Sequence, residues 1–79
     1  MDLRQLFATN LRRIRHARKL SQESLAHDAG VDRAYLSWVE RAVTYVGLEI
    51  IEKLAQILEV DPAEFFRRPG LAGSRRKAE

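Results

Sequence analysis

The side chains with the clearest chemistry lie between Ser21 and Arg41, in the stretch SQESLAHDAGVDRAYLSWVER. Arg33 begins the second of two helical patterns there, and a guanidinium at that place can donate two hydrogen bonds to O6 and N7 of a guanine. A solvated arginine is the alternative, but the helix dipole disfavours a cation at a helix start. Ser37, one turn further, can bond a base edge or a phosphate, or remain a plain surface serine. These residue types indicate recognition of double-stranded DNA.

Two short helices joined at a glycine must position these side chains. Ser21 can cap a helix over residues 22–28, and Asp32 can cap a second over residues 33–41. Only residues 29–31, with Gly30 in the middle, lie between the first helix and the cap Asp32, so the helices must cross steeply and Gly30 needs a positive φ. This is the geometry of a helix-turn-helix, whose second helix can enter a major groove.

The rest of the chain predicts an all-α, compact domain of five helices without strands. An amphipathic helix is expected from about Leu3 to Arg18, a fourth helix through LEIIEKLAQILEV after a cap at Gly47 or Thr44, and a short fifth helix opened by Asp61 and Pro62. The expected core stripes are Leu3, Phe7, Leu11 and Ile14, and Leu48, Ile51, Ala55 and Leu58. The domain should occupy residues 1–66, followed by a basic, disordered tail over residues 67–79.

Composition places the chain among small proteins of a reducing compartment. It has 79 residues, no cysteine, and no apolar run at its start that would serve as a signal peptide or membrane span. The expected location is the cytoplasm, in association with the nucleoid. Residues 1–41 hold eight Lys and Arg against five Asp and Glu, whereas residues 42–66 hold only Lys53 against five acidic residues. A polyanion would therefore bind the helix-turn-helix half and the tail.

Nothing in the sequence supports catalysis or a bound cofactor. The chain lacks a glycine-flanked nucleophile, a phosphate-binding loop and a distinctive pair of carboxylates. His16 and His27 are eleven residues apart without a third ligand nearby, so two solvated histidines are expected and no metal site.

The run LSQESLAHDAGVDRAYLSWVER, followed by LEIIEKLAQILEVDPAEFF, closely resembles the Cro/C1-type helix-turn-helix family. This family includes phage repressors, plasmid and antitoxin regulators, and controller proteins of restriction-modification systems, and DRAYLSWVER is most similar to the controller proteins. The resemblance covers about residues 10–66. One departure is the segment 42–47, where members usually show Gly-x-x-Asn-Pro-Ser and this chain has AVTYVG. A basic residue that reaches DNA from this loop in some controller proteins is replaced by Thr44.

The resemblance implies roles for several residues. Gln22 would hold a phosphate together with its helix N-terminus, rather than merely fill a first turn. Ala34 would face the groove and offer a methyl contact to thymine, and Trp38 occupies a position that contacts bases in related phage repressors. Arg15 and Glu40 would form a structural salt bridge between the first helix and the end of the recognition helix.

Other positions are interpreted from the residues themselves. Trp38 can pack on DNA or cover residues 43–46. Tyr35 should bury its ring and point its hydroxyl to a phosphate, and Asp32 should act first as a cap. The complete predicted DNA-binding set is Gln22, Asp32, Arg33, Ala34, Tyr35, Ser37, Trp38 and Arg41.

A second apolar stripe on the fourth helix predicts a homodimer on a palindromic operator. The expected interface residues are Tyr45, Ile50, Leu54, Ile57, Phe65 and Phe66. The alternative is that the monomer core uses this whole stripe. Two other functions also stay open, an antitoxin that binds a toxin and a protein-interaction module without DNA binding, with a toxin or a polymerase as the protein partner.

Overall fold

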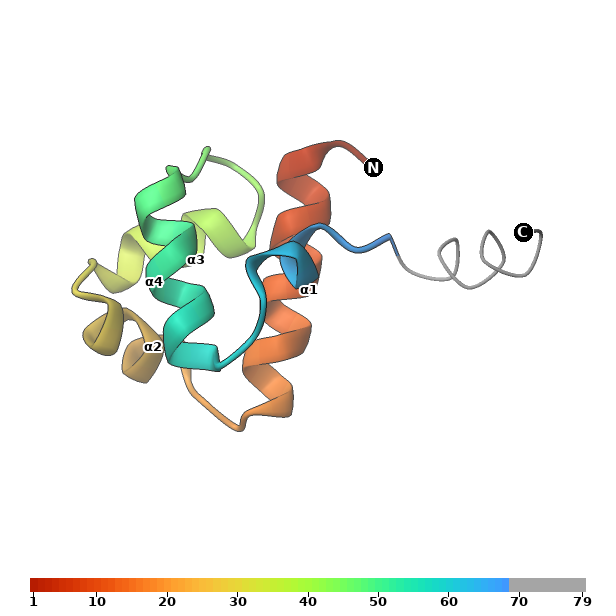
Figure 1. Ribbon diagram of the computed structural model, residues 1–79. Helices are drawn as coiled ribbons and strands as arrows, with labels where there is room; N and C mark the ends of the chain where they lie inside the picture. Colours follow the sequence, from red (N-terminus) through yellow and green to blue (C-terminus); the bar gives the residue numbers. More distant parts are fainter. Residues whose placement is uncertain (69–79) are drawn as a thin grey trace.

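The computed structural model describes residues 1–68, and within them every regular element is helical (Figure 1). The elements are α1 (Leu3–Ala17), α2 (Gln22–Ala29), α3 (Arg33–Glu40), α4 (Leu48–Leu58) and the 3-10 helix η1 (Pro62–Phe66). Most of the expected tail lies outside the described residues, from position 69 onward.

The expectation of a fifth α-helix is wrong, because the segment after Asp61 forms a single 3-10 element of five residues. Its hydrogen bond runs from the Glu64 N–H to the Asp61 carbonyl, three residues back, at 2.8 Å. The predicted cap at Asp61 is confirmed, since its carboxylate accepts from the Ala63 N–H at 2.9 Å. Beyond Phe66 the backbone of Arg67 is extended, which stops the turn before an α-helix can form.

Helix α1 begins at a capping box formed by Asp2 and Gln5. The Asp2 carboxylate accepts from the Gln5 N–H, and the Gln5 side chain accepts from the Asp2 N–H, both at 3.0 Å. The helix buries Leu6, Phe7, Ala8, Leu11 and Ile14. Leu3, expected in the core stripe, is exposed at the first position of the helix.

The turn between α2 and α3 has the predicted geometry. Gly30 adopts φ 69° and ψ 32°, the left-handed conformation that ends α2. A Cβ added there would meet no atom within 4 Å, so the backbone conformation, and not lack of space, favours glycine. Ser21 caps α2 as expected, with its hydroxyl accepting from the Ser24 N–H at 3.0 Å.

The core lies where all five elements meet, and it includes Ile51, Ala55 and Leu58 of the expected α4 stripe. Leu54 and Phe65, predicted at a dimer interface, are both fully buried in this core at 0% exposure. Leu48, predicted in the core, is 84% exposed. The side chain of a first helical residue points back beyond the helix end, so Leu48 projects away from the packed elements.

Asn10 fastens the end of the described chain to α1. Its side-chain amide donates to the Phe65 carbonyl and to the Arg67 carbonyl, each at 2.9 Å. Phe65 is thereby held against Phe7, with ring centroids 5.0 Å apart. None of the helices in residues 1–68 is long and apolar enough to cross a lipid bilayer.

Candidate nucleic-acid interface

The outer side of α3 presents a continuous strip of side chains to solvent. Arg33, Ala34, Trp38 and Arg41 are exposed and Ser37 is half-buried, at the spacing of one helical face. Leu36, Val39 and Glu40 are buried on the opposite side. We call the five outward residues the outer face of α3. The structure thus brings together five members of the predicted DNA-binding set.

Two basic side chains on this face lack a carboxylate partner. Neither Arg33 nor Arg41 forms an ion pair with any group of residues 1–68. The Arg41 Nε donates only to the Ser37 carbonyl, at 3.4 Å. By contrast, Arg18 and Arg67 each pair with a glutamate of the chain. The outer face of α3 therefore carries two positive charges that have no ion-pair partner within residues 1–68.

Trp38 is the large aromatic side chain of this face, and it is 48% exposed. Its backbone carbonyl accepts from the Val43 N–H at 3.1 Å, so the segment after α3 folds back beside it. Half of the indole nevertheless remains in contact with solvent. A ring in this position combines a large apolar surface with a ring N–H donor.

Tyr35 and Asp32 differ in how well they match their expected roles. Tyr35 is half-buried and packs against the core, as expected for its ring. Asp32 stands at the N-cap of α3 in extended conformation, but its carboxylate makes no capping hydrogen bond. The expectation that Asp32 acts first as a cap is wrong. The carboxylate is exposed instead, and the first N–H groups of α3 have no side-chain cap.

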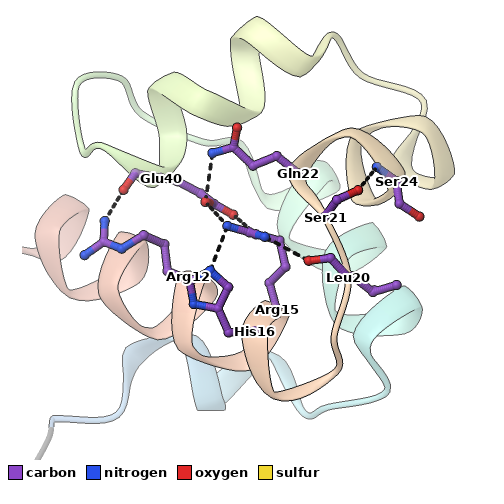
Figure 2. Close-up of polar contacts among 8 residues, drawn as sticks. All are labelled: Arg12, Arg15, His16, Leu20, Ser21, Gln22, Ser24 and Glu40. Atoms are coloured by element: carbon purple, nitrogen blue, oxygen red, sulfur yellow. Dashed lines mark hydrogen bonds and ion pairs between the residues drawn. The ribbon is translucent and has the colours of Figure 1, made fainter.

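Gln22, the first residue of α2, bonds within the protein. Its amide nitrogen donates to the Glu40 carboxylate at 3.0 Å (Figure 2). The side chain is therefore fixed between the start of α2 and the end of α3. An amide nitrogen carries two hydrogens, so the bond to Glu40 uses one of two donors.

Arg15 and Glu40 form the predicted salt bridge, and it is a two-bond contact. The Arg15 Nε lies 2.7 Å from Glu40 Oε2 and its Nη2 lies 2.9 Å from Oε1 (Figure 2). The exposed fractions of the two side chains are 10% and 1%. A third nitrogen of Arg15 donates to the Leu20 carbonyl at 2.8 Å, which also ties the α1–α2 connection to the pair.

Arg12 of α1 contacts the end of α3. Its Nη1 donates to the backbone carbonyl of Glu40, within the last turn of the helix (Figure 2). A cation at a helix C-terminus is favoured by the helix dipole. The three-residue spacing of Arg12 and Arg15 puts both on one face of α1, and this spacing was the signal in the sequence that could have revealed the role.

Together these contacts fix the recognition helix to the domain. The Glu40 carboxylate accepts from α1 and from α2, and its carbonyl accepts from α1. Every buried side-chain N or O atom in the described chain has a hydrogen-bond partner. We call Arg12, Arg15, Gln22 and Glu40 the Glu40 junction. This junction holds the inner side of α3 while its outer face stays free.

The described residues offer little else for a site. No three His, Cys, Asp or Glu side chains among residues 1–68 come close enough together to hold a metal ion. Of the predicted dimer residues, Tyr45 and Phe66 are exposed, Ile50 and Ile57 are partly buried against the core, and Leu54 and Phe65 are inside it.

Comparison with protein families agrees with this geometry. Residues 6–65 match the model of a helix-turn-helix domain family. The chain belongs to the Cro/C1-type helix-turn-helix family. The match includes all of α2, the turn and α3, and most of α1 and η1.

Controller proteins are among the family members similar to this chain. Control protein C.SmaI of Serratia marcescens is 37% identical over 71 residues, covering 90% of this chain and 84% of its own length. Control protein C.BamHI of Bacillus amyloliquefaciens is 38% identical over 64 residues, covering 80% and 79%. The crystal structure of the restriction-modification controller protein C.AhdI from Aeromonas hydrophila has a TM-score of 0.77 at 44% identity, covering 80% of this chain and 96% of that one.

This Cro/C1-type protein is therefore a DNA-binding transcriptional regulator of the controller-protein type. Its relatives are control proteins rather than enzymes, in agreement with the prediction that the chain is not an enzyme.

Proposed function

We propose that this regulator binds a palindromic operator as a homodimer and reads it with the outer face of α3. The observation that carries the proposal is the contrast on α3, where two unpaired arginines and an exposed tryptophan stand on a helix whose inner side is fixed at the Glu40 junction. A fixed helix with free donors meets the requirement for reading base edges in a major groove.

Arg33 is the base-reading residue of this proposal. It begins α3, and the first residues of a recognition helix reach deepest into the groove. Its guanidinium forms no ion pair within residues 1–68, so DNA does not have to displace an internal partner. Two parallel hydrogen bonds to a guanine are the contact that this geometry favours.

The apolar and hydroxyl groups of the outer face complete the readout. Ala34 offers a methyl to the C5-methyl of a thymine, and Ser37 offers a hydroxyl one turn further. Trp38 packs its exposed half on sugars and methyl groups, which removes that apolar surface from water.

Phosphate contacts would surround this strip and set the register. The second N–H of the Gln22 amide donates to a phosphate while the first stays on Glu40. Arg41, which follows Glu40, contacts a phosphate near the same end of α3 as Gln22, and the Tyr35 hydroxyl contacts one from the first turn of α3. Asp32, exposed and without a capping bond, disfavours a phosphate in the wrong register.

The size of the recognition surface supports a dimer. One α3 of eight residues spans only a few base pairs, whereas two copies related by a twofold axis reach successive major grooves about 34 Å apart. The similarity to C.SmaI, C.BamHI and C.AhdI supports an operator in the control region of a restriction-modification system.

Selection of bound sequences from random DNA with the purified protein tests the proposal. We expect a recovered site with twofold symmetry, bound by two chains. The Arg33→Ala variant should lose preference for this site, whereas Lys53→Ala, which removes one charge from α4, should retain it. Recovery of no preferred sequence would overturn the proposal, and co-purification of a toxin would favour an antitoxin.

A further inference from the structure

The large exposed apolar side chains of residues 1–68 are concentrated at one end of the molecule. Trp38 lies on the outer face of α3. The others come from the start of α1, the segment between α3 and α4, the first residue of α4 and the end of η1, and they are Met1, Leu3, Val43, Tyr45, Leu48 and Phe66. The start of α1, the start of α4 and the segment that connects α3 to α4 lie at the same end of the ribbon (Figure 1). Such a concentration marks an interaction surface.

This surface is hollowed by a groove of about 230 Å³. Its apolar walls are formed by Phe7, Val39, Val46 and Ile51, which come from α1, α3, the connecting segment and α4. The exposed side chains of Leu3, Tyr45 and Phe66 form its rim. The groove is therefore suited to an apolar side chain delivered from outside.

One charged group lines this groove. The Arg4 guanidinium carbon stands 4.5 Å from the centre of the Tyr45 ring. Within residues 1–68, Arg4 forms no ion pair with a carboxylate. A cation that is half-buried beside an apolar groove favours an occupant that brings an acidic group next to an apolar one.

An apolar and an acidic side chain stand next to each other at the same end of the molecule. Leu48 is 84% exposed and follows two residues after the groove residue Val46. Glu49, next to it in the first turn of α4, is exposed and forms no ion pair with the described residues. A protruding leucine with an adjacent carboxylate complements a groove with an adjacent guanidinium.

We propose that the groove receives Leu48 of a second copy of this chain, and that Arg4 pairs with Glu49 of that copy. Because projection and groove lie on one surface, a twofold axis makes the contact twice, which is the defining property of an isologous interface. The inference rests on the dimer of the proposed function. It moves the centre of the interface from the Ile50 and Ile57 stripe to the groove.

A second copy explains more of the surface than a small ligand would. An amphipathic organic acid could fill the groove and reach Arg4, but it would leave Leu48 and the unpaired Glu49 exposed. The second copy covers both, together with the rim. The proposal therefore accounts for the projecting residues as well as for the hollow.

Charge exchange in the full chain tests the pairing. The variants Arg4→Glu and Glu49→Arg should each weaken the dimer by at least about tenfold, because each brings like charges together twice. The double variant Arg4→Glu with Glu49→Arg should return the dissociation constant to within about threefold of wild type. The matched control, Arg4→Glu with Glu52→Arg, has the same net charge as this double variant. Its dissociation constant should stay as weak as that of Arg4→Glu alone. Analytical ultracentrifugation measures the constants, and thermal unfolding checks each fold.

Leu48→Ala provides a second measurement that does not depend on charge. An exposed side chain adds little to the stability of the monomer. The melting temperature of the Leu48→Ala variant at low protein concentration should therefore equal that of wild type, while its dimerisation weakens. Single charge variants that dimerise like wild type, or a double variant that is not rescued, would overturn the proposal.

The outcomes separate this inference from the proposed function. Dimers that bind the operator normally in every variant would place the interface elsewhere and leave the function standing. A wild-type chain that saturates a single half-site as a monomer would overturn both. Dodecanoate binding that requires Arg4 but not Glu49, without any change in dimerisation, would assign the groove to an organic acid instead.

Discussion

The inner and outer sides of α3 differ in how their polar groups are satisfied. On the inner side the Glu40 carboxylate accepts hydrogen bonds from two other helices and is 1% exposed. On the outer side Arg33 and Arg41 face solvent without an ion pair in the described chain. A buried, paired charge stabilises an orientation, whereas a free charge is available to a ligand. The same eight-residue helix thus separates stability from recognition, and substitutions on its two sides should have different consequences.

The largest expected effect comes from Glu40→Ala on the inner side. It leaves the buried Arg15 guanidinium without its carboxylate and Gln22 without its acceptor, so the free energy of unfolding should fall by about 3 kcal/mol. Urea or thermal unfolding of the purified variant measures this loss. Glu52→Ala, which removes an exposed carboxylate from α4, is the control and should change stability by less than about 0.5 kcal/mol. An unchanged melting temperature for Glu40→Ala would mean that the pair is exposed and weak in solution.

On the outer side, Arg33→Ala should leave stability unchanged and reduce operator preference. Loss of a two-bond guanine contact costs about 1–3 kcal/mol at one base pair in each half-site. Fluorescence anisotropy with operator and scrambled duplexes at fixed salt separates the loss of sequence preference from a loss of general DNA affinity. An equal loss of affinity for both duplexes would place Arg33 on the phosphate backbone.

Arg12→Ala tests whether the inner side also includes the helix end. The variant loses a charged donor to the Glu40 carbonyl, which should lower the free energy of unfolding by about 1–2 kcal/mol. Arg13→Ala, its exposed neighbour on α1, is the matched control and should have a smaller effect. Equal effects for the two arginines would show that the Glu40 carbonyl does not need this partner.

The smallest expected effect is a gain of stability just beyond the junction. Ala42 has φ 62°, a left-handed conformation that costs a residue with a Cβ about 1 kcal/mol relative to glycine. Ala42→Gly should therefore raise the free energy of unfolding by about 0.5–1 kcal/mol, after the greater flexibility of glycine in the unfolded chain is included. Chemical denaturation decides the sign, and a destabilised variant would contradict the strain at this position.

What the sequence predicted well was local. Ser21 and Gly30 act on neighbouring backbone groups, so their residue types determine a cap and a left-handed turn. The pairing of Arg15 with Glu40 followed from family resemblance, because two residues 25 positions apart have no local signal. The positions of α2 and α3 followed from the same patterns.

What the sequence could not settle was the burial of two leucines of α4 and the partners of polar side chains. Leu48 and Leu54 are both leucines on an apolar helix, and only packing against α1 and η1 decides that Leu54 is buried and Leu48 exposed. Asp32 has the residue type and backbone of a cap without the hydrogen bond. The side-chain bond of Gln22 depends on where Glu40 stands after the helices have packed.

The attachment of α3 at Glu40 also makes the helix a lever. With a rise of 1.5 Å per residue, Arg33 stands about 10 Å along the axis from the attachment point. A tilt of about 5° at that point displaces the Arg33 end by about 1 Å, which is more than the tolerance of a base-edge hydrogen bond. Contacts to phosphates, made by long side chains, can follow such a displacement. Small rearrangements at Glu40 would therefore reduce sequence specificity before they reduce overall affinity for DNA.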